Sequence, residues 1–238
     1  MSLKHKLRTI LWRLGYDIIP FTPQSHPLAR RRRLLDYNKI SLVLDIGANA
    51  GQFGQELRQD LGYSNKIISF EPMHDAFKLL EEKSSIDEHW DVYNFALGDT
   101  NGTSEINVAE NSYSSSLLEM MPAHVQSAPD SKYVKKEVIE IRSLDAIFSD
   151  IAEPDGRIYM KIDTQGFENR VLKGASSSLA GIDMIQMEMS LVPMYKGELL
   201  FNDLCTIVSE KGYSLVAVEP VFSNPDTGQL LQLDGIFQ

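Results

Sequence analysis

An acidic residue and two glycines stand together in the segment VLDIGANAGQF, which runs from Val43 to Phe53. The branched apolar residues at its start predict a buried strand, and the glycines predict a tight turn after that strand. A helix beginning directly after the turn would point its free N–H groups into it. Ligands of doubly wound sheets bind beyond the carboxyl ends of the strands. The sequence therefore predicts a binding site made by Asp45, Gly47, Asn49, Gly51 and Gln52.

The spacing of this turn separates two kinds of cofactor. A dinucleotide site requires G-x-G-x-x-G to cradle a pyrophosphate, whereas this turn reads G-A-N-A-G, with Asn49 in place of the second glycine. Asp45 would also repel a phosphate, but it suits a ligand that carries an ammonium group. Glu71 ends the next predicted strand, 20 positions after Gly51, where a carboxylate can accept both hydroxyls of a ribose. These features favour S-adenosylmethionine as the cofactor.

The third predicted strand, WDVYNFALGD, ends in two further candidates for cofactor contacts. Either Asp99 or the backbone near Ala96 would meet the amino group of the adenine. The alternative interpretation is that Gly98 and Asp99 form an ordinary turn.

Three acidic residues later in the chain are candidates for chemistry on a hydroxyl acceptor, which needs positioning and a base. Asp163 ends the strand YMKID with Lys161 on the same side, and Glu188 comes from the end of the neighbouring strand. We expect Asp163 to act as the base, assisted by Glu188, with Lys161 beside them. Alternatively these two carboxylates and Glu168 hold a divalent cation that lowers the pKa of the acceptor. A purely structural interpretation is that Asp163 caps the next helix and Lys161 pairs with Glu188.

The loop between residues 111 and 132 is long enough to act as a lid. Its hydroxyl-rich part, Ser112 to Leu118, would bind a sugar or form an ordinary polar cover, and His124 is a candidate contact for an acceptor. Tyr195 would stack on a sugar face or pack at the rim of the domain. Cys205 falls among the apolar positions of a helix and is expected to fill the core.

The elements that must position these residues alternate between strand and helix patterns from Leu42 onward. This alternation predicts an α/β fold: a doubly wound, mostly parallel, seven-stranded Rossmann-like sheet. The last strand follows a turn too short for a helical crossover, so it should run antiparallel. The segments TSEINVAE and KEVIEIRSL alternate by twos and predict an inserted antiparallel pair.

Charge divides the chain into two regions. Its net charge is −10, but the part up to Arg33 carries +7 and the remainder −17. We expect a basic helical extension over residues 1–38 and the main domain over residues 39–238. The acidic domain argues against nucleic acid as a partner. The basic tail up to Arg33 is interpreted as a solvated helix covering the edge of the domain, with the run Arg30 to Arg33 as part of the fold; the alternative is that the basic N-terminus contacts an anionic membrane face. One cysteine, no leader pattern and no apolar run of about 20 residues favour a cytoplasmic protein.

At this point the sequence resembles a known family. The segments VLDIGANAGQFGQELR, IISFEP, FALGD, YSSSLLEM, YMKIDTQGFENRVLKGA and LLQLDGIF together resemble the FkbM family of S-adenosylmethionine-dependent methyltransferases. The resemblance implies a methyltransferase sheet, a cofactor held by Asp45, Gly47, Asn49, Gly51, Gln52 and Glu71, and methyl transfer to an oxygen. The acceptor it implies is a sugar hydroxyl of a glycan, glycolipid or natural product. Many relatives carry Glu where this chain has Gln165.

Two other functions were weighed against methyl transfer. A non-catalytic protein that keeps the fold would bind S-adenosylmethionine without turnover. An NAD(P)-dependent sugar oxidoreductase or epimerase needs the G-x-G-x-x-G turn and usually a Tyr-x-x-x-Lys pair, and the sequence has neither. The sequence does not determine a metal requirement, the acceptor or the oligomeric state.

Overall fold

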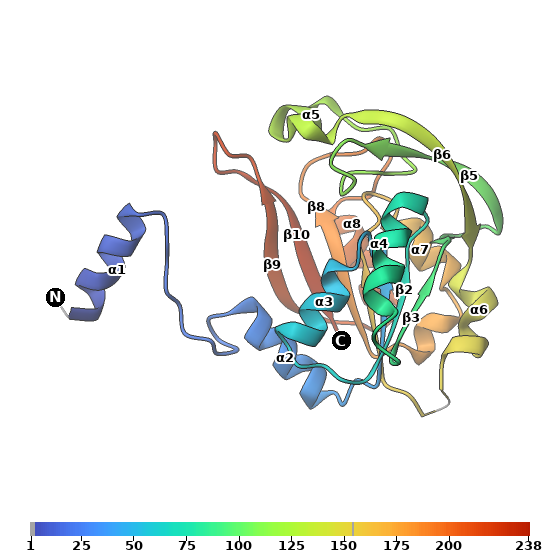
Figure 1. Ribbon diagram of the computed structural model, residues 1–238, viewed down its shortest axis with the longest axis horizontal. Coiled ribbons are helices and arrows are strands. Elements are labelled where there is room, and N and C mark those ends of the chain that lie inside the picture. Colours follow the sequence, from blue (N-terminus) through green and yellow to red (C-terminus); the bar gives the residue numbers. More distant parts are fainter. Residues whose placement is uncertain (1–2, 154) are drawn as a thin grey trace.

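The predicted strands of the main domain form one seven-stranded sheet in the order β3-β2-β1-β7-β8-β10-β9 (Figure 1). The structure, a computed structural model, describes residues 3–153 and 155–238. The strands of this sheet are β1 (Leu42–Ile46), β2 (Lys66–Phe70), β3 (Trp90–Tyr93), β7 (Ile158–Ile162), β8 (Met184–Ser190), β9 (Leu215–Ser223) and β10 (Leu230–Phe237).

The pairing of the strands agrees with the predicted topology. β1 pairs in parallel with β2 and β7, and β7 pairs in parallel with β8. β10 runs antiparallel to both of its neighbours, β8 and β9. The carboxyl ends of β1, β2, β7 and β8 therefore lie along one edge of the sheet, which is where a doubly wound fold binds its ligands.

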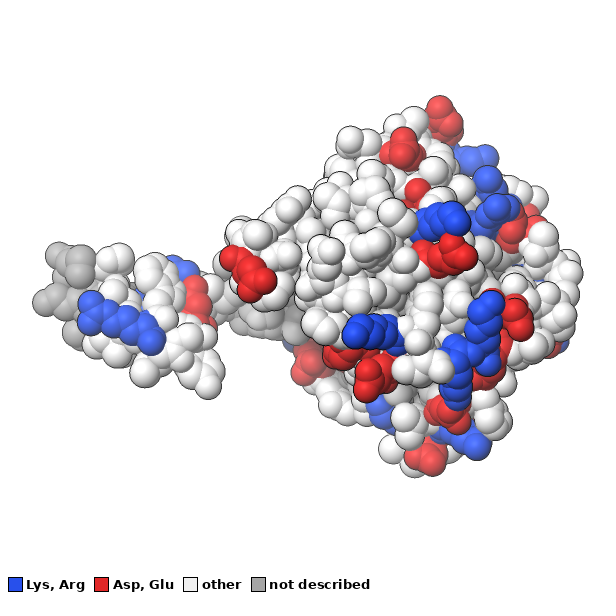
Figure 2. Space-filling view, turned by 90° about the horizontal axis from the view of Figure 1, so that it is seen from above, with Lys and Arg blue, Asp and Glu red and all other residues white. Residues whose placement is uncertain are grey.

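Two helices precede the sheet and differ in how they are placed. α1 (Leu3–Arg13) stands away from the domain at the end of an extended segment, as both views show (Figures 1 and 2). α2 (Pro27–Tyr37) packs on the domain, and the guanidinium group of Arg31 is buried between Glu56 and Glu219. Arg31 is thus buried in the fold, which differs from the expectation of a fully solvated charge run, whereas Arg32 and Arg33 are exposed as expected.

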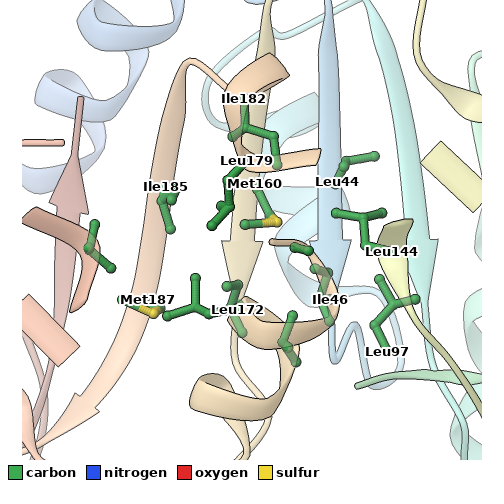
Figure 3. Packing of buried hydrophobic residues seen from close by; sticks show 14 of the residues in the cluster. Leu44, Ile46, Leu97, Leu144, Met160, Leu172, Leu179, Ile182, Ile185 and Met187 are labelled. Atoms are coloured by element: carbon green, nitrogen blue, oxygen red, sulfur yellow. The ribbon is translucent and has the colours of Figure 1, made fainter. Parts of the chain in front are cut away.

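Helices cover both faces of the sheet, because alternate residues of each strand point to opposite sides. On one face, Leu44, Ile46 and Met160 pack against α6 (Leu144–Ile151), α7 (Glu168–Gly174) and α8 (Phe201–Glu210), and Figure 3 shows Leu144 and Leu172 of these helices in that core. On the other face, Val43 packs against α2, α3 (Gln52–Gln59) and α4 (His74–Ser84).

A smaller sheet of three strands, in the order β4-β6-β5, lies above the strand ends. Its antiparallel pair, β5 (Gly102–Ala109) and β6 (Tyr133–Arg142), is the predicted inserted hairpin (Figure 1). Between these two strands lie α5 (Pro122–Ser127) and a short 3₁₀ turn, η1 (Pro129–Ser131); a second turn, η2 (Ser178–Gly181), precedes β8.

The prediction of one continuous third strand is wrong. β3 ends at Tyr93, and β4 (Ala96–Leu97) pairs with β6 in the smaller sheet. The chain turns at Asn94, whose side-chain amide donates hydrogen bonds to the carbonyl oxygens of Glu71 and Pro72. Local periodicity cannot reveal this break, because the partners of Asn94 lie more than 20 positions earlier.

No helix within the described residues is both long and apolar enough to cross a membrane.

Candidate functional site

The predicted glycine turn links the ends of three strands. Gly47 follows β1 with a φ of 79°, and a Cβ atom at this position would lie 1.9 Å from the carbonyl oxygen of Asp163. Asn49 also adopts a left-handed conformation, and its backbone N–H donates to Glu71 Oε2 at 2.8 Å. The turn is therefore held against the ends of β2 and β7 by close backbone contact and by this hydrogen bond.

Glu71 lies at the end of β2 with its side chain turned into the protein. Its two carboxylate oxygens accept N–H groups from Asn49 and Met73, each at 2.8 Å. The residue is 3% exposed, and burial raises the pKa of its carboxyl group to about 7. Each oxygen keeps a lone pair, so Glu71 can accept two further hydrogen bonds from a ligand.

Asp45 does not face an open position, which corrects the expectation that it meets a ligand's ammonium group directly. It is fully buried on β1, where the Ser69 hydroxyl donates to its Oδ2 atom at 3.2 Å. The cation that it faces is Lys161, whose Nζ atom lies 3.5 Å from Asp45 and 3.1 Å from Asp163. These two carboxylates raise the pKa of the Lys161 ammonium group despite its burial. The alternative pairing of Lys161 with Glu188 is therefore wrong.

Gln165 joins the two predicted catalytic carboxylates. Its Nε2 atom donates to Asp163 Oδ1 at 2.8 Å and to Glu188 Oε2 at 2.6 Å, and its Oε1 atom accepts the Tyr195 hydroxyl at 2.6 Å. The backbone of Gln165 is left-handed, with a φ of 54°, which is costly for a residue with a side chain. Burial and the charge of Asp163 hold the pKa of Glu188 well above its ordinary value.

Glu168 is close in sequence to these residues but is turned away from them. Its Oε1 atom accepts the N–H groups of Thr164 and Gly166 and the Thr164 hydroxyl. Glu168, rather than Asp163, therefore stabilises the loop before α7, which corrects the capping interpretation. Within residues 3–153 and 155–238, no three acidic, histidine or cysteine side chains are grouped so that they could bind a metal ion, so the predicted convergence of carboxylates on a cation does not occur.

A cavity of about 290 Å³ opens at the strand ends, and we call it the strand-end cavity. Glu71, Asp163 and Glu188 line it on the polar side. Most of the remaining lining is apolar, and part of the predicted lid lines the cavity through Ser112 and Tyr113. Its further lining includes Gly47, Asn49, Pro72, Met73, Ala96, Leu97, Gln165 and Phe167.

A second hollow of about 320 Å³, which we call the side groove, lies over β7, β8 and β10. Its polar lining includes Lys161, Gln186 and Asp234, and Gln186 Nε2 donates to Asp234 Oδ2 at 2.7 Å. Burial is the main reason that the pKa of Asp234 is raised to about 6. The strand-end cavity and the side groove share Gly47, Asn49, Tyr113 and Asp163 in their linings. Asp163 therefore stands where the two hollows meet.

Like Asp45, three other predicted cofactor contacts do not line the strand-end cavity. Gly51 precedes α3 and packs on Leu80 and Trp90. Gln52 lines the side groove and donates to the Tyr113 hydroxyl at 3.1 Å. The Asp99 carboxylate accepts a hydrogen bond from Arg170 at 2.7 Å, so that ion pair replaces the expected adenine contact, whereas Ala96 does line the cavity.

The predicted lid, and Tyr195 beside it, pack against the rest of the protein more closely than the sequence indicated. Tyr195 is fully buried, and His124 packs edge-on against its ring with centroids 5.1 Å apart. Because both residues are buried, neither is exposed for stacking on a sugar or for reaching an acceptor. The same burial lowers the pKa of His124 to about 4. The Ser116 hydroxyl donates to the carbonyl oxygen of Gln165, which fastens the lid to the loop after β7.

Gln186 and Asp234 were not predicted from the sequence as site residues. Each belongs to a set of polar residues at every second position, Gln186, Glu188 and Ser190 in MIQMEMS and Gln232 and Asp234 in LLQLDGIF, with apolar residues between them. A polar residue on one face of an otherwise buried strand is a usable signal, because burial of such a group requires a partner.

One family model matches most of the main domain. The family model described as "Methyltransferase FkbM domain" matches residues 45–215. No curated protein matches the chain.

Among solved structures, the chain is similar to methyltransferase FkbM from Methylobacillus flagellatus KT, with a TM-score of 0.52 and 14% identity over 82% of this chain. The match spans 43% of that protein's length. TehB from Haemophilus influenzae matches with a TM-score of 0.46 and 11% identity, over 86% of this chain and 59% of that one. The first of these likenesses supports the fold.

Proposed function

The chain belongs to the FkbM methyltransferase family, and on that premise we propose that it is an S-adenosylmethionine-dependent O-methyltransferase acting on a sugar hydroxyl. The observation that carries the proposal is the meeting of the strand-end cavity and the side groove at Asp163. A methyl donor and its acceptor need separate hollows that join at one point, and a base belongs at that point.

The strand-end cavity suits S-adenosylmethionine, which supplies a methyl group bonded to a cationic sulfur. Glu71 offers two carboxylate oxygens with free lone pairs to the ribose hydroxyls, at the end of β2. Pro72, Met73, Leu97 and Phe167 give the adenine an apolar surface. In this proposal the carboxylates of Asp163 and Glu188 favour the positive sulfur, and Asp45 acts through Lys161 rather than on the cofactor.

The side groove suits a polyhydroxylated acceptor. Asp234 presents carboxylate oxygens that can accept hydroxyl groups, Gln186 holds that carboxylate through its amide, and Phe53 and Tyr113 add aromatic faces. The Arg31 and Glu56 charges in this groove neutralise each other through their ion pair. This lining favours a sugar, glycan or glycolipid headgroup over a nucleic acid.

Asp163 accepts the proton of the acceptor hydroxyl in this mechanism. It lines both hollows, and Lys161 and Gln165 fix its orientation through hydrogen bonds to its two oxygens. Glu188 lies on the other side of the Gln165 amide and holds that amide in place. Lys161, Gln165 and Glu188 are therefore positioning residues for Asp163.

The proposal is tested with S-adenosylmethionine labelled in its methyl group and a panel of sugar nucleotides, methyl glycosides and glycans, with and without a chelator. Wild-type protein should label at least one hydroxylated acceptor. Asp163→Asn should bind the uncharged thioether S-adenosylhomocysteine as the wild type does and lower turnover by about 10²- to 10⁴-fold. Asp91→Asn, a control at an exposed ion pair with Lys66, should keep full turnover. Tight cofactor binding with no labelled acceptor would instead favour a non-catalytic binding protein.

A further inference from the structure

The N-terminal segment, residues 3–21, exposes an unusual amount of apolar surface. Eight of the twenty exposed large hydrophobic residues in the described chain lie between Leu7 and Phe21. Leu7, Ile10 and Leu14 are 56%, 55% and 66% exposed. A cluster of this kind on a protein surface marks an interaction site.

The helix of this segment is amphipathic. Leu7, Ile10 and Leu14 follow a spacing of three and four residues, which places them on one face of α1 and its end. Trp12 lies off this face, and the Arg8 guanidinium group stacks over its ring at 5.1 Å. Arg8 also forms an ion pair with Asp17 at 2.7 Å, and this pair holds the segment after α1 close to the helix.

α1 has too little support of its own to be stable in water. It is 11 residues long, and isolated helices shorter than about 12–15 residues are marginal. Both views show it standing away from the domain (Figures 1 and 2). An external apolar surface is therefore needed to hold this helix and to cover its exposed face.

The charge of the segment indicates which surface this is. Residues 3–21 carry Lys4, Lys6, Arg8 and Arg13 against Asp17 alone, a net charge of +3, whereas the chain after Arg33 carries −17. A cationic amphipathic helix binds anionic lipid headgroups while its apolar face enters the interface. The acidic domain would be repelled by the same lipids and would face the water.

We propose that residues 3–21 dock the protein on an anionic membrane surface, as an interfacial helix that lies on the bilayer and does not cross it. Tyr16, Ile18, Ile19 and Phe21, all exposed, extend the apolar contact beyond α1. This inference is independent of the proposed catalytic function, because none of these residues lines the strand-end cavity or the side groove.

The test is flotation of the full-length protein with vesicles of phosphatidylcholine alone and with 30% phosphatidylglycerol, a composition of about one anionic lipid in three. We expect binding to the anionic vesicles, weaker binding at high salt, and little binding to the neutral ones. Leu7→Glu/Ile10→Glu should lower the partition coefficient about tenfold or more. Lys4→Gln/Arg13→Gln should lower it by about tenfold on anionic vesicles.

The matched control is Leu79→Glu/Ile86→Glu, which adds the same charges at two exposed apolar residues of the domain and should leave binding unchanged. Thermal unfolding of each variant checks that the domain is intact. Vesicle binding that survives Leu7→Glu/Ile10→Glu, or its absence in the wild type, would overturn the proposal. Two other results would also overturn it, because each would give the apolar face of α1 a partner other than the membrane. One is a dimer, seen by light scattering, that Leu7→Glu/Ile10→Glu dissociates. The other is a structure in which α1 packs on the exposed valines of β9.

Discussion

Gln165 shows how one neutral side chain holds an acidic site together. Asp163 and Glu188 would repel each other if nothing lay between them, and the Gln165 amide donates a hydrogen bond to each. An amide can make both bonds at any pH, whereas a carboxylate can donate only when protonated. Gln165 is therefore an organising group of this site.

Replacing Gln165 by Glu should make the stability of the protein depend on pH. The new carboxyl would lie between the carboxylate of Asp163 and the buried carboxyl group of Glu188, so its pKa in the folded state rises above its unfolded value. The contribution of the protonated carboxyl group at position 165 to folding stability is present at low pH and is lost as pH rises through its folded-state pKa. Urea unfolding should show that Gln165→Glu has a free energy of unfolding on the order of 1–3 kcal/mol below that of the wild type at pH 8. At pH 5 the difference should be smaller. Gln229→Glu, at an exposed position, should show neither effect.

Glu71 should make cofactor affinity depend on pH. Its pKa of about 7, raised by burial, means that the free protein loses stability as pH rises through 7, because the folded state holds a proton that the unfolded state has released. Ribose hydroxyls donate to the ionised carboxylate, so affinity should be full above pH 7 and fall by up to about tenfold per pH unit below it.

Calorimetric titration of S-adenosylhomocysteine between pH 6 and pH 8.5 measures this dependence. Glu71→Gln should bind about ten- to a hundredfold more weakly at pH 8 and lose the pH dependence. A variant that binds like the wild type at pH 8 would remove Glu71 from the cofactor site.

The turn between β1 and α3 depends on contact with an element more than 100 positions later. Gly47 has a φ of 79°, and its Cα atom packs directly against the backbone of Asp163. A side chain at Gly47 would therefore displace the residue on which the proposed chemistry depends.

Gly47→Ala should lower the free energy of unfolding by more than backbone strain alone would. Gly62 provides the matched control, because its φ of 68° is also left-handed but a Cβ atom there would have no neighbour within 4 Å. We expect Gly62→Ala to cost about 1–2 kcal/mol and Gly47→Ala to cost more, with loss of cofactor binding. Equal unfolding free energies for the two variants would show that the contact with Asp163 is loose.

α2 is fixed to the domain by a buried ion pair network. Arg31 pairs with Glu56 and Glu219, and the side chain of Glu219 is 6% exposed. Arg31→Met would remove the hydrogen-bonded cation of the buried Glu219 and leave it only Arg30, whose guanidinium group lies 4.0 Å away, so the fold should be destabilised by about 3–5 kcal/mol. Arg32→Met, one position away and exposed, should change stability by less than about 0.5 kcal/mol in chemical denaturation. Similar losses for both variants would contradict a specific role for Arg31.

For the molecule as a whole, the sequence predicted the strand segments and their mostly parallel pairing well, because strands follow local patterns of apolar residues and the short last connection requires an antiparallel strand. It also located Glu71, Asp163 and Glu188, since each ends a buried strand. It could not predict that Lys161 would face Asp45, that Asn94 would break the third strand, or that Glu168 would turn into its own loop. Those features depend on partners that are distant in sequence or on the conformation of a loop, and neither leaves a periodic signal.

The division into an extension over residues 1–38 and a domain over residues 39–238 stays a proposal. α2 packs on the domain whereas α1 stands apart, so the two helices of the proposed extension differ in their attachment. In the arrangement we propose, α1 lies on a membrane while the acidic domain and its two hollows face the water.

A crystal structure with S-adenosylhomocysteine tests most directly whether the strand-end cavity is the cofactor site. We predict that the ligand fills this cavity, with both ribose hydroxyls within hydrogen-bonding distance of Glu71 and its sulfur directed toward Asp163. A ligand bound in the side groove or elsewhere, or a strand-end cavity left empty at saturating ligand, would contradict the proposed function.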